Sequence, residues 1–332
     1  MKRPSSHGIV VAVVDATTLL GRDLRSVLSE RAFPASSVLL FHSGDHEGLV
    51  TEDDEGAAFV APLAPDALET ARIAFLCGDA ADTARFLSRR RDDGCLAIDL
   101  SGIRTGGVYA RPSAAEGQPP LPPGDLFLTD HPVAAVLAEA VQVVEELAPV
   151  AGVTAAIDRP ASELGSGALD ELFRQAIALA RFESVPKEIL GTQLAFNAYF
   201  PPDSEEFEAR VAEDVARLAG RPVSPALLSV RCGVFHGHLL RVEFRTEGAA
   251  PSEEAVREAF RKDDGFEESD AESLSGPVES AGRDETLLLQ VACSGRSVRI
   301  GLAADHLRRA GAVMAVKLAE QAVRERGLLA DA

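Results

Sequence analysis

The chain has no tryptophan, two tyrosines, two methionines and only four cysteines among its 332 residues. So few aromatic side chains leave few platforms on which single-stranded nucleic acid stacks. The cysteines lie far apart, form no Cys-x-x-Cys pair and stand in apolar stretches: Cys77, Cys95, Cys232 and Cys293. We therefore predict reduced, buried thiols, a pattern typical of a cytoplasmic protein.

Basic side chains are scarce relative to acidic ones, 33 against 52, which leaves a formal net charge of −19. This charge repels phosphate backbones and anionic lipid headgroups, so we predict no binding to nucleic acid or to a membrane surface. No apolar run approaches the roughly 20 residues that a membrane-spanning helix needs. We recognise no signal peptide either, because no small-residue cleavage site follows an isolated apolar stretch near the N-terminus.

The first 131 residues alternate short apolar runs with helical patterns. Strand candidates are the apolar runs at 8–16, 36–43, 58–63, 71–78 and 95–102. Leucine and valine at helical spacing predict a helix after the first strand, and a second helix is expected at 79–93. Strands that alternate with helices in this way are typical of a doubly wound parallel sheet, which gives an α/β fold class.

The second half of the chain is organised differently. Pro132 is suited to the first turn of a strong amphipathic helix that leads into this half. Strand-like runs and helical patterns then mix, which predicts an α+β domain. The strands are expected at 153–158, 227–235, 238–246, 286–294 and 298–304, and the helices at 169–181, 204–220, 252–262 and 306–327.

The turn after the first strand is the position at which dinucleotide-binding proteins place glycines and bind a pyrophosphate at a helix N-terminus. Of positions 15, 18 and 21, only Gly21 is glycine. Asp15 adds a negative charge, and its repulsion of a phosphate at about 4 Å approaches roughly 4 kcal/mol. Two interpretations stay open: a scaffold without cofactor, or a dinucleotide bound in an altered way.

Five segments resemble aspartate-semialdehyde dehydrogenases, the two-domain enzymes that reductively dephosphorylate aspartyl phosphate with NADPH. They are VVDATTLLGRDLRSVLSERAFP at 13–34, AIDLSG at 97–102, LAFNAYFP at 194–201, RCGVFHGH at 231–238 and ADHLRRAGAVMAVKLAE at 304–320. The resemblance extends over nearly the whole chain. It implies a Rossmann-like NAD(P)-binding-type domain at 1–131, with a C-terminal helix at 304–328 packing back on it. Residues 132–303 would form the semialdehyde dehydrogenase dimerisation domain.

The residues that carry the covalent chemistry of that family are missing. Pro132, or a neighbour, stands at the position of the catalytic cysteine, and proline offers no nucleophile. We interpret His131 as a capping or surface histidine rather than a replacement nucleophile. Arg159 stands where the active-site glutamine is expected.

The anion-binding positions of the family carry acids here. The substrate-binding pattern Glu-Glu-x-Lys reads EEFE at 205–208, so Glu208 replaces the lysine, and only Glu205 remains as a candidate for substrate binding. The segment that should hold the arginine for the cofactor's 2′-phosphate contains Asp45 and Glu47 instead. A preference for NADP therefore has no support in these residues.

Three basic residues survive from the family pattern. Arg231 and His238 keep the spacing of its carboxylate-binding arginine and acid–base histidine, and Arg104, shifted by one residue, stands for its anion-binding arginine. Arg231 and His238 are either a working clamp and general acid–base, or structurally satisfied residues on a central strand. If a dinucleotide binds, the resemblance assigns it to Thr17, Thr18, Gly21 and Ser101.

The remaining constellations give no catalytic or metal site. His236 and His238 share one face of an expected strand, but no third ligand accompanies them, so we predict no metal. No cofactor is expected, or NAD(P) if any is bound.

Our leading hypothesis is a homodimeric pseudoenzyme of this family, which could also associate with an active paralogous dehydrogenase. The alternatives are a carbonyl oxidoreductase that uses His238 and Arg231 without covalent catalysis, and a small-ligand sensor or scaffold partner.

Overall fold

The computed structural model describes residues 8–44, 49–53, 56–91, 94–112, 120–220, 223–270 and 274–329. The chain divides into two compact units. Unit 1 comprises Met1–Asp130 and Gly311–Ala332, and unit 2 comprises His131–Ala310. Asp45 and Glu47, which the sequence places at a cofactor-binding segment, lie outside the described residues.

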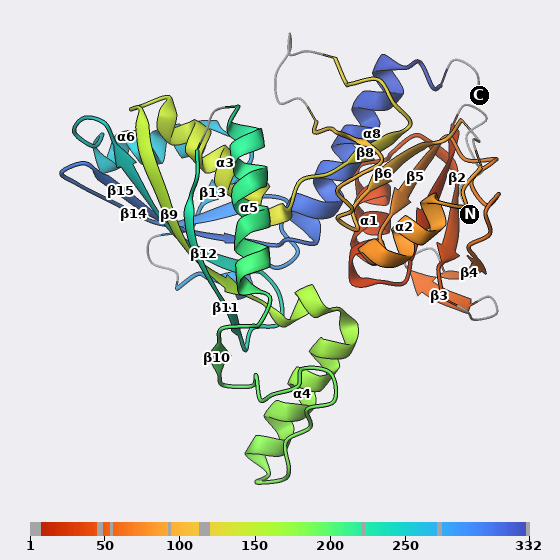
Figure 1. Cartoon of the computed structure of the whole chain (residues 1–332), viewed down its shortest axis with the longest axis horizontal. Coiled ribbons are helices and arrows are strands. Elements are labelled where there is room, and N and C mark those ends of the chain that lie inside the picture. Colours follow the sequence, from red (N-terminus) through yellow and green to blue (C-terminus); the bar gives the residue numbers. More distant parts are fainter. Residues whose placement is uncertain are drawn as a thin grey trace. The chain divides into compact units, whose positions relative to one another are not determined.

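Unit 1 is built on a sheet with the strand order β3-β4-β2-β1-β5-β6-β8-β7 (Figure 1). Its pairs are parallel except for the antiparallel hairpin of β3 and β4. The strands are β1 (Ile9–Val14), β2 (Ala35–His42), β3 (Leu49–Asp53), β4 (Gly56–Pro62), β5 (Ile73–Leu76), β6 (Leu96–Asp99), β7 (Val108–Tyr109) and β8 (Leu126–Leu128).

Helices cover both faces of this sheet. Val11 and Val13 of β1 belong to the same buried cluster as residues of α1 (Leu19–Glu30) and α8 (Met314–Glu325). Ala12 and Val14 point to the opposite face, where their cluster includes Phe86 of α2 (Ala80–Leu87). Burial on both faces explains why β1 is an unbroken apolar run. The prediction of an α/β doubly wound sheet is confirmed.

Unit 2 contains a mixed sheet with the order β10-β11-β9-β12-β15-β14-β13. One face packs against the helices α3 (Pro132–Glu145), α5 (Ser204–Ala219) and α6 (Glu253–Lys262). The strands are β9 (Val150–Arg159), β10 (Ala198–Tyr199), β11 (Ala226–Cys232), β12 (His238–Thr246), β13 (Phe266–Glu268), β14 (Thr286–Ser294) and β15 (Ser297–Ala304). The remaining helices are η1 (Ala161–Leu164), α4 (Ser166–Ala180) and α7 (Pro277–Ser280), and η2 (Arg308–Val313) spans the boundary between the two units in the sequence. The predicted α+β organisation is confirmed.

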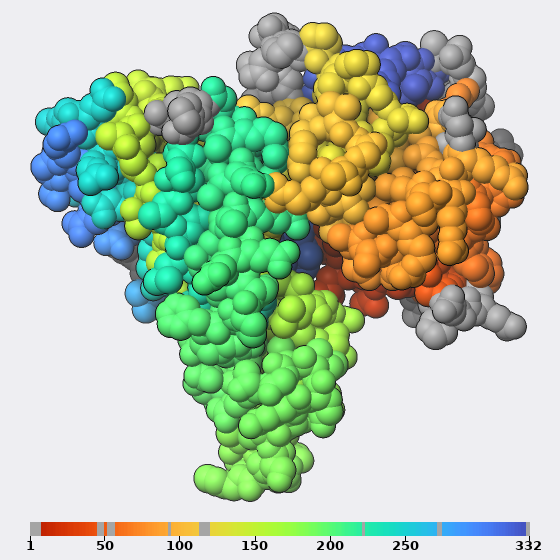
Figure 2. Space-filling model, in the orientation of Figure 1, coloured from red at the N-terminus to blue at the C-terminus, as the bar shows by residue number. Residues whose placement is uncertain are grey.

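The other face of this sheet and the α4 segment, residues 164–200, expose side chains of two kinds. Along β12 every second residue is exposed from Arg241 to Arg245, and these are charged. The α4 segment instead exposes large apolar side chains: Leu164, Phe173, Phe182, Ile189, Phe196 and Phe200. Figure 2 shows the segment as a green lobe that extends from unit 2.

Short strands mark where the sequence patterns were insufficient. The strands β3, β7, β8, β10 and β13 were not predicted, and all of these except β3 have only two or three residues. Strands of two or three residues have no recognisable period. The strand expected at 227–235 ends at Cys232. Within the described residues, no helix is both long and apolar enough to cross a membrane.

Gly21 permits a close approach of α1 to the preceding turn. A Cβ at this position would lie 2.5 Å from the Asp15 carbonyl oxygen and 2.9 Å from Ala16 Cα, both backbone atoms. We expect Gly21→Ala to lower the free energy of unfolding by about 1–3 kcal/mol, because the backbone must shift. Gly248→Ala is the control, since no atom lies within 4 Å of its added Cβ. Urea unfolding of both variants tests this, and equal stabilities would contradict it.

Candidate functional site

Three cationic or titratable side chains project from adjacent strand ends in unit 2. Arg159 is the last residue of β9, Arg231 lies opposite it on the parallel strand β11, and His238 is the first residue of the antiparallel strand β12. All three point to the helix-covered face and are at most 4% exposed. Sheet register therefore brings together Arg231 and His238, the two predicted catalytic residues, with Arg159.

A fourth residue, Glu163, reaches these strand ends from η1. The backbone of η1 is fixed to the β11–β12 connection because Ala161 N–H donates to Val234 O and Ser162 N–H to Phe235 O. Gly165 then adopts φ +84° and precedes α4. These constraints hold the Glu163 side chain over the ends of the central strands.

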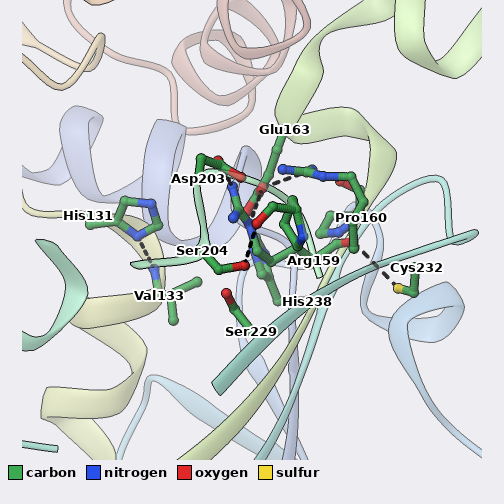
Figure 3. A network of polar contacts seen from close by, with 12 residues as sticks. His131, Val133, Arg159, Pro160, Glu163, Asp203, Ser204, Ser229, Cys232 and His238 are labelled. Atoms are coloured by element: carbon green, nitrogen blue, oxygen red, sulfur yellow. Dashed lines mark hydrogen bonds and ion pairs between the residues drawn. The ribbon is translucent and has the colours of Figure 1, made fainter. Parts of the chain in front are cut away.

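The Glu163 carboxylate binds all three strand-end side chains (Figure 3). Its Oε1 lies 2.6 Å from His238 Nε2. Its Oε2 accepts from Arg159 Nε at 2.8 Å and lies 3.0 Å from an Arg231 guanidinium nitrogen. Both carboxylate oxygens are therefore occupied by charged or charge-assisted partners.

The carboxylate is ionised in this setting. Burial alone raises the pKa of Glu163, but the hydrogen bond and charge of His238 and the charges of Arg159 and Arg231 outweigh it. Together they hold its pKa well below the usual range. A buried ion cluster of this kind is costly to break, because a lone charge then stays in a dry environment.

Each arginine has a second anchor. Arg159 donates to Asp203 Oδ2 at 2.8 Å, and its guanidinium lies 3.9 Å from the centre of the Phe207 ring. Arg231 donates to the Pro160 carbonyl at 2.9 Å. Each guanidinium group is thus held by Glu163 and by a second partner.

Pro132 and His131 form the start of α3. Pro132 is in the first turn, as predicted, and His131 is the N-cap, whose Nδ1 accepts from Val133 N–H at 3.2 Å. The His131 ring packs edge-on against Phe207, and its backbone N–H donates to Asp214. Burial lowers the pKa of His131 to about 3, with nearby Glu163 opposing and other basic groups adding to the effect. His131 is a neutral capping histidine.

A second histidine contacts the ion cluster. The His306 ring lies edge-on to His238, with 4.8 Å between the ring centres. Within the part of the chain that the structure describes, the two ring nitrogens of His306 have no hydrogen-bond partner. The Nδ1 atom of His238 has none within that part either. Burial, followed by the charge of His238, lowers the pKa of His306 to about 3.

In unit 1, Asp15 lies where the sheet order reverses. β2 and β5 flank β1 on opposite sides, and such a reversal is where α/β sheets bind ligands at their carboxyl ends. The Asp15 Oδ1 atom accepts from both the backbone N–H and the hydroxyl of Ser43 at 2.8 Å. Its Oδ2 lies 2.1 Å from where a Cβ of Gly78 would be. The carboxylate therefore fills the space above β1, β2 and β5.

The other cofactor candidates make structural hydrogen bonds. The Thr18 hydroxyl caps α1 by accepting from Gly21 N–H at 3.0 Å and lies within donating distance of the Asp15 and Cys77 carbonyls. Ser101 donates its hydroxyl and backbone N–H to buried Asp99. Thr17 is half-buried in the turn. Gly21, the fourth candidate, allows α1 to pack closely against the backbone of Asp15 and Ala16.

The substrate candidates lie apart in the chain and differ in exposure. Arg104 is exposed in unit 1, where it lines a cleft of about 720 Å³ together with Arg90, Arg91 and Asp125. Glu205 is exposed in the first turn of α5 in unit 2. Glu208 accepts hydrogen bonds from the Ser229 backbone N–H and hydroxyl and so joins α5 to β11.

The thiols are unsuited to nucleophilic chemistry. Cys77 and Cys95 are buried as predicted, whereas Cys232 and Cys293 are half-buried. Cys232 is the thiol beside the ion cluster, with its Sγ 3.5 Å from Arg159 O. Burial and then the charge of Asp158 raise its pKa, which lowers its thiolate fraction. Among the described residues, no group of three or more metal-binding side chains is arranged to hold an ion.

Glu163, Asp203 and His306 join the site without having been expected there. An acid four residues after a strand-end arginine is a weak local signal for Glu163. His306 and Asp203 carry none, since they reach the cluster from distant segments.

No model of a known protein family matches the chain. Among characterised proteins, it is 24% identical over 340 residues to aspartate-semialdehyde dehydrogenase of Rickettsia conorii, covering 94% of this chain and 97% of that protein. It is 27% identical over 347 residues to the USG-1 protein homolog of Pseudomonas aeruginosa, covering 95% and 98%.

Solved structures share the fold. A probable aspartate-semialdehyde dehydrogenase from Pseudomonas aeruginosa matches with a TM-score of 0.86 at 24% identity, over 96% of this chain and 99% of that one. Aspartate semialdehyde dehydrogenase II from Vibrio cholerae, complexed with ASA, matches with a TM-score of 0.82 at 20% identity and the same coverage.

The lowered pKa of His306 predicts a loss of stability in mild acid. Below about pH 6.5 the unfolded chain takes up a proton that folded His306 binds only near pH 3, so the free energy of unfolding falls as pH falls between these values. His238, Glu163, Asp305 and His236 are the charged or titratable groups that act on the His306 ring. We expect His306→Asn to reduce the loss between pH 7 and pH 5 by about 2 kcal/mol.

Urea unfolding of the wild type and the variant at both pH values measures this difference. Equal losses in the two proteins would show that His306 does not titrate as described.

Proposed function

The chain belongs to the aspartate-semialdehyde dehydrogenase family, and we propose that it is a pseudoenzyme that does not catalyse the family's reductive dephosphorylation. The observation that carries this proposal is Pro132 in the first turn of α3, at the position that the resemblance assigns to the catalytic cysteine. Acyl transfer through a thioester needs a thiolate, and proline has no nucleophilic atom in its side chain.

Neighbouring side chains do not replace the missing thiol. His131 is neutral, and its Nδ1 lone pair is used by the Val133 N–H. Cys232 has a raised pKa and lies on the strand next to Arg231 rather than at the helix start. A thiol with a raised pKa is a poor nucleophile at neutral pH. Both observations support loss of covalent catalysis.

The same proposal extends to the cofactor. The Asp15 carboxylate stands at the reversal of the sheet in unit 1, where a pyrophosphate would need glycine and helix dipole. The Asp15 carboxylate would repel a pyrophosphate bound beside it, because both are negatively charged. We therefore propose that neither NADP nor NAD binds with useful affinity. NAD(P) remains the cofactor class to test, because it is the one that the family uses.

A non-covalent carbonyl oxidoreductase would need Arg231 and His238 to be available to a substrate. Both side chains contact Glu163 instead, and Arg231 is 2% exposed. Their engagement supports the structural interpretation of these residues over a catalytic one.

We also propose that the protein self-associates through the α4 segment. Monomeric proteins rarely expose contiguous apolar patches, and here Phe182 and Phe196 are 97% and 83% exposed. Phe173 and Phe200 extend the apolar surface of the same segment. A second copy of the chain would bury these side chains.

The catalytic part of the proposal predicts no turnover. With aspartate semialdehyde, phosphate and NADP⁺, we expect no reduction of NADP⁺ above the uncatalysed rate, and no increase in melting temperature with NADP⁺ or NAD⁺ alone. A ligand at about 100 times its Kd would add about 2.7 kcal/mol of stability and be readily detected. An active family member assayed in parallel is the positive control. Turnover on the order of 1 s⁻¹ or faster would refute the proposal.

The self-association part is tested separately by sedimentation at micromolar concentration. We expect the wild type to be a dimer and Phe173→Glu to be a monomer, because the interface would have to bury a carboxylate. Phe59→Glu is the matched control, since Phe59 is 64% exposed on β4 of unit 1. A monomeric wild type, or a Phe173→Glu variant that stays dimeric, would contradict this interface.

A further inference from the structure

The three partners of Glu163 form a receptor for a carboxylate. Arg159, Arg231 and His238 come from neighbouring strands whose register fixes their spacing. The anchors of the two arginines, at Asp203 and at the Pro160 carbonyl, do not involve Glu163. The two guanidinium groups are therefore also held by contacts other than the anion that they bind, and His238 is placed by its position at the start of β12.

Glu163 approaches this receptor as a separate ligand does. It belongs to η1, outside the sheet, and its carboxylate meets the strand ends with both oxygens bound. Two arginine guanidinium groups and an imidazole are the donors that recognise free carboxylates in proteins. Glu163 thus supplies an anion that such a receptor would otherwise bind from solution.

We propose that Glu163 is a built-in ligand that fills a preformed carboxylate-binding site, and that the site takes a small free carboxylate once this side chain is shortened. The inference rests on the proposed function, because it concerns the same site, and it explains why Arg231 and His238 persist without catalysis. The class of ligand is a small aliphatic carboxylate.

The size of the ligand follows from the substitution that exposes the site. Glu163→Ala removes Cγ, Cδ and both carboxylate oxygens, which are the same heavy atoms that make up an acetate ion. Arg231 is 2% exposed, and in this variant it would lose its carboxylate partner. An unpaired buried cation favours any anion that fits, so acetate binding and folding are linked in the variant.

The experiment compares melting temperatures in sodium acetate and in sodium chloride of equal ionic strength. We expect acetate to raise the melting temperature of Glu163→Ala by about 3 °C or more over chloride, and to give no such difference in the wild type. Glu163→Gln is the matched control: its amide still fills the site, so acetate is expected to have no specific effect.

A second variant separates binding at this site from general effects of acetate. In Glu163→Ala/Arg231→Met one of the two guanidinium groups that face the vacated space is gone, and the acetate-specific increase should fall to less than half. If Glu163→Ala does not fold in chloride, the yield of folded protein on refolding in acetate becomes the measurement. An equal response of Glu163→Ala and wild type to acetate, or an equal refolding yield in both salts, would overturn the proposal.

Failure here is distinguishable from failure of the proposed function. Turnover by the wild type would refute the pseudoenzyme without affecting the acetate result. An absent acetate effect would refute the built-in ligand while the wild type stayed inactive.

Discussion

The ion cluster around Glu163 joins separate segments of unit 2. Two arginines that are almost fully buried at the ends of β9 and β11 need an anion, because breaking a buried pair costs about 3–5 kcal/mol. Glu163 supplies it, and in doing so ties η1 to the ends of β9, β11 and β12. The start of α4, and with it the exposed apolar segment that follows, is set by the same attachment.

Unit 1 shows the same arrangement at a different place. Asp15 puts a carboxylate at the reversal of the parallel sheet and satisfies it with Ser43. Asp99, the last residue of β6, is buried and accepts hydrogen bonds from the backbone N–H groups of Ser101, Gly102 and Ile103. Backbone donors and guanidinium groups that α/β proteins often use for ligands are here bonded to acids of the chain itself.

Long periodic elements were predictable, and short or contact-dependent ones were not. The run at 8–16 predicts a strand buried on both faces, and β1 is one, because each face must pack against a helix layer. The strands β7 and β10 have two residues each, so pairing with a neighbour, rather than their own pattern, makes them strands. The exposed aromatic residues of the α4 segment carry no periodic signal either, since neither spacing nor composition states which side chains remain uncovered.

The sequence by itself determined that residue 132 is proline and residue 15 is aspartate, and it determined the α/β and α+β patterns, because these depend on residue type and local spacing. Only the tertiary structure decided what Arg231 and His238 do. Glu163 and His238 are 75 positions apart, and they meet because β9 and β12 pair and η1 folds back over their ends. A retained arginine and histidine are identical in sequence whether they await a ligand or already hold one, and the difference lies in which carboxylate the fold brings to them.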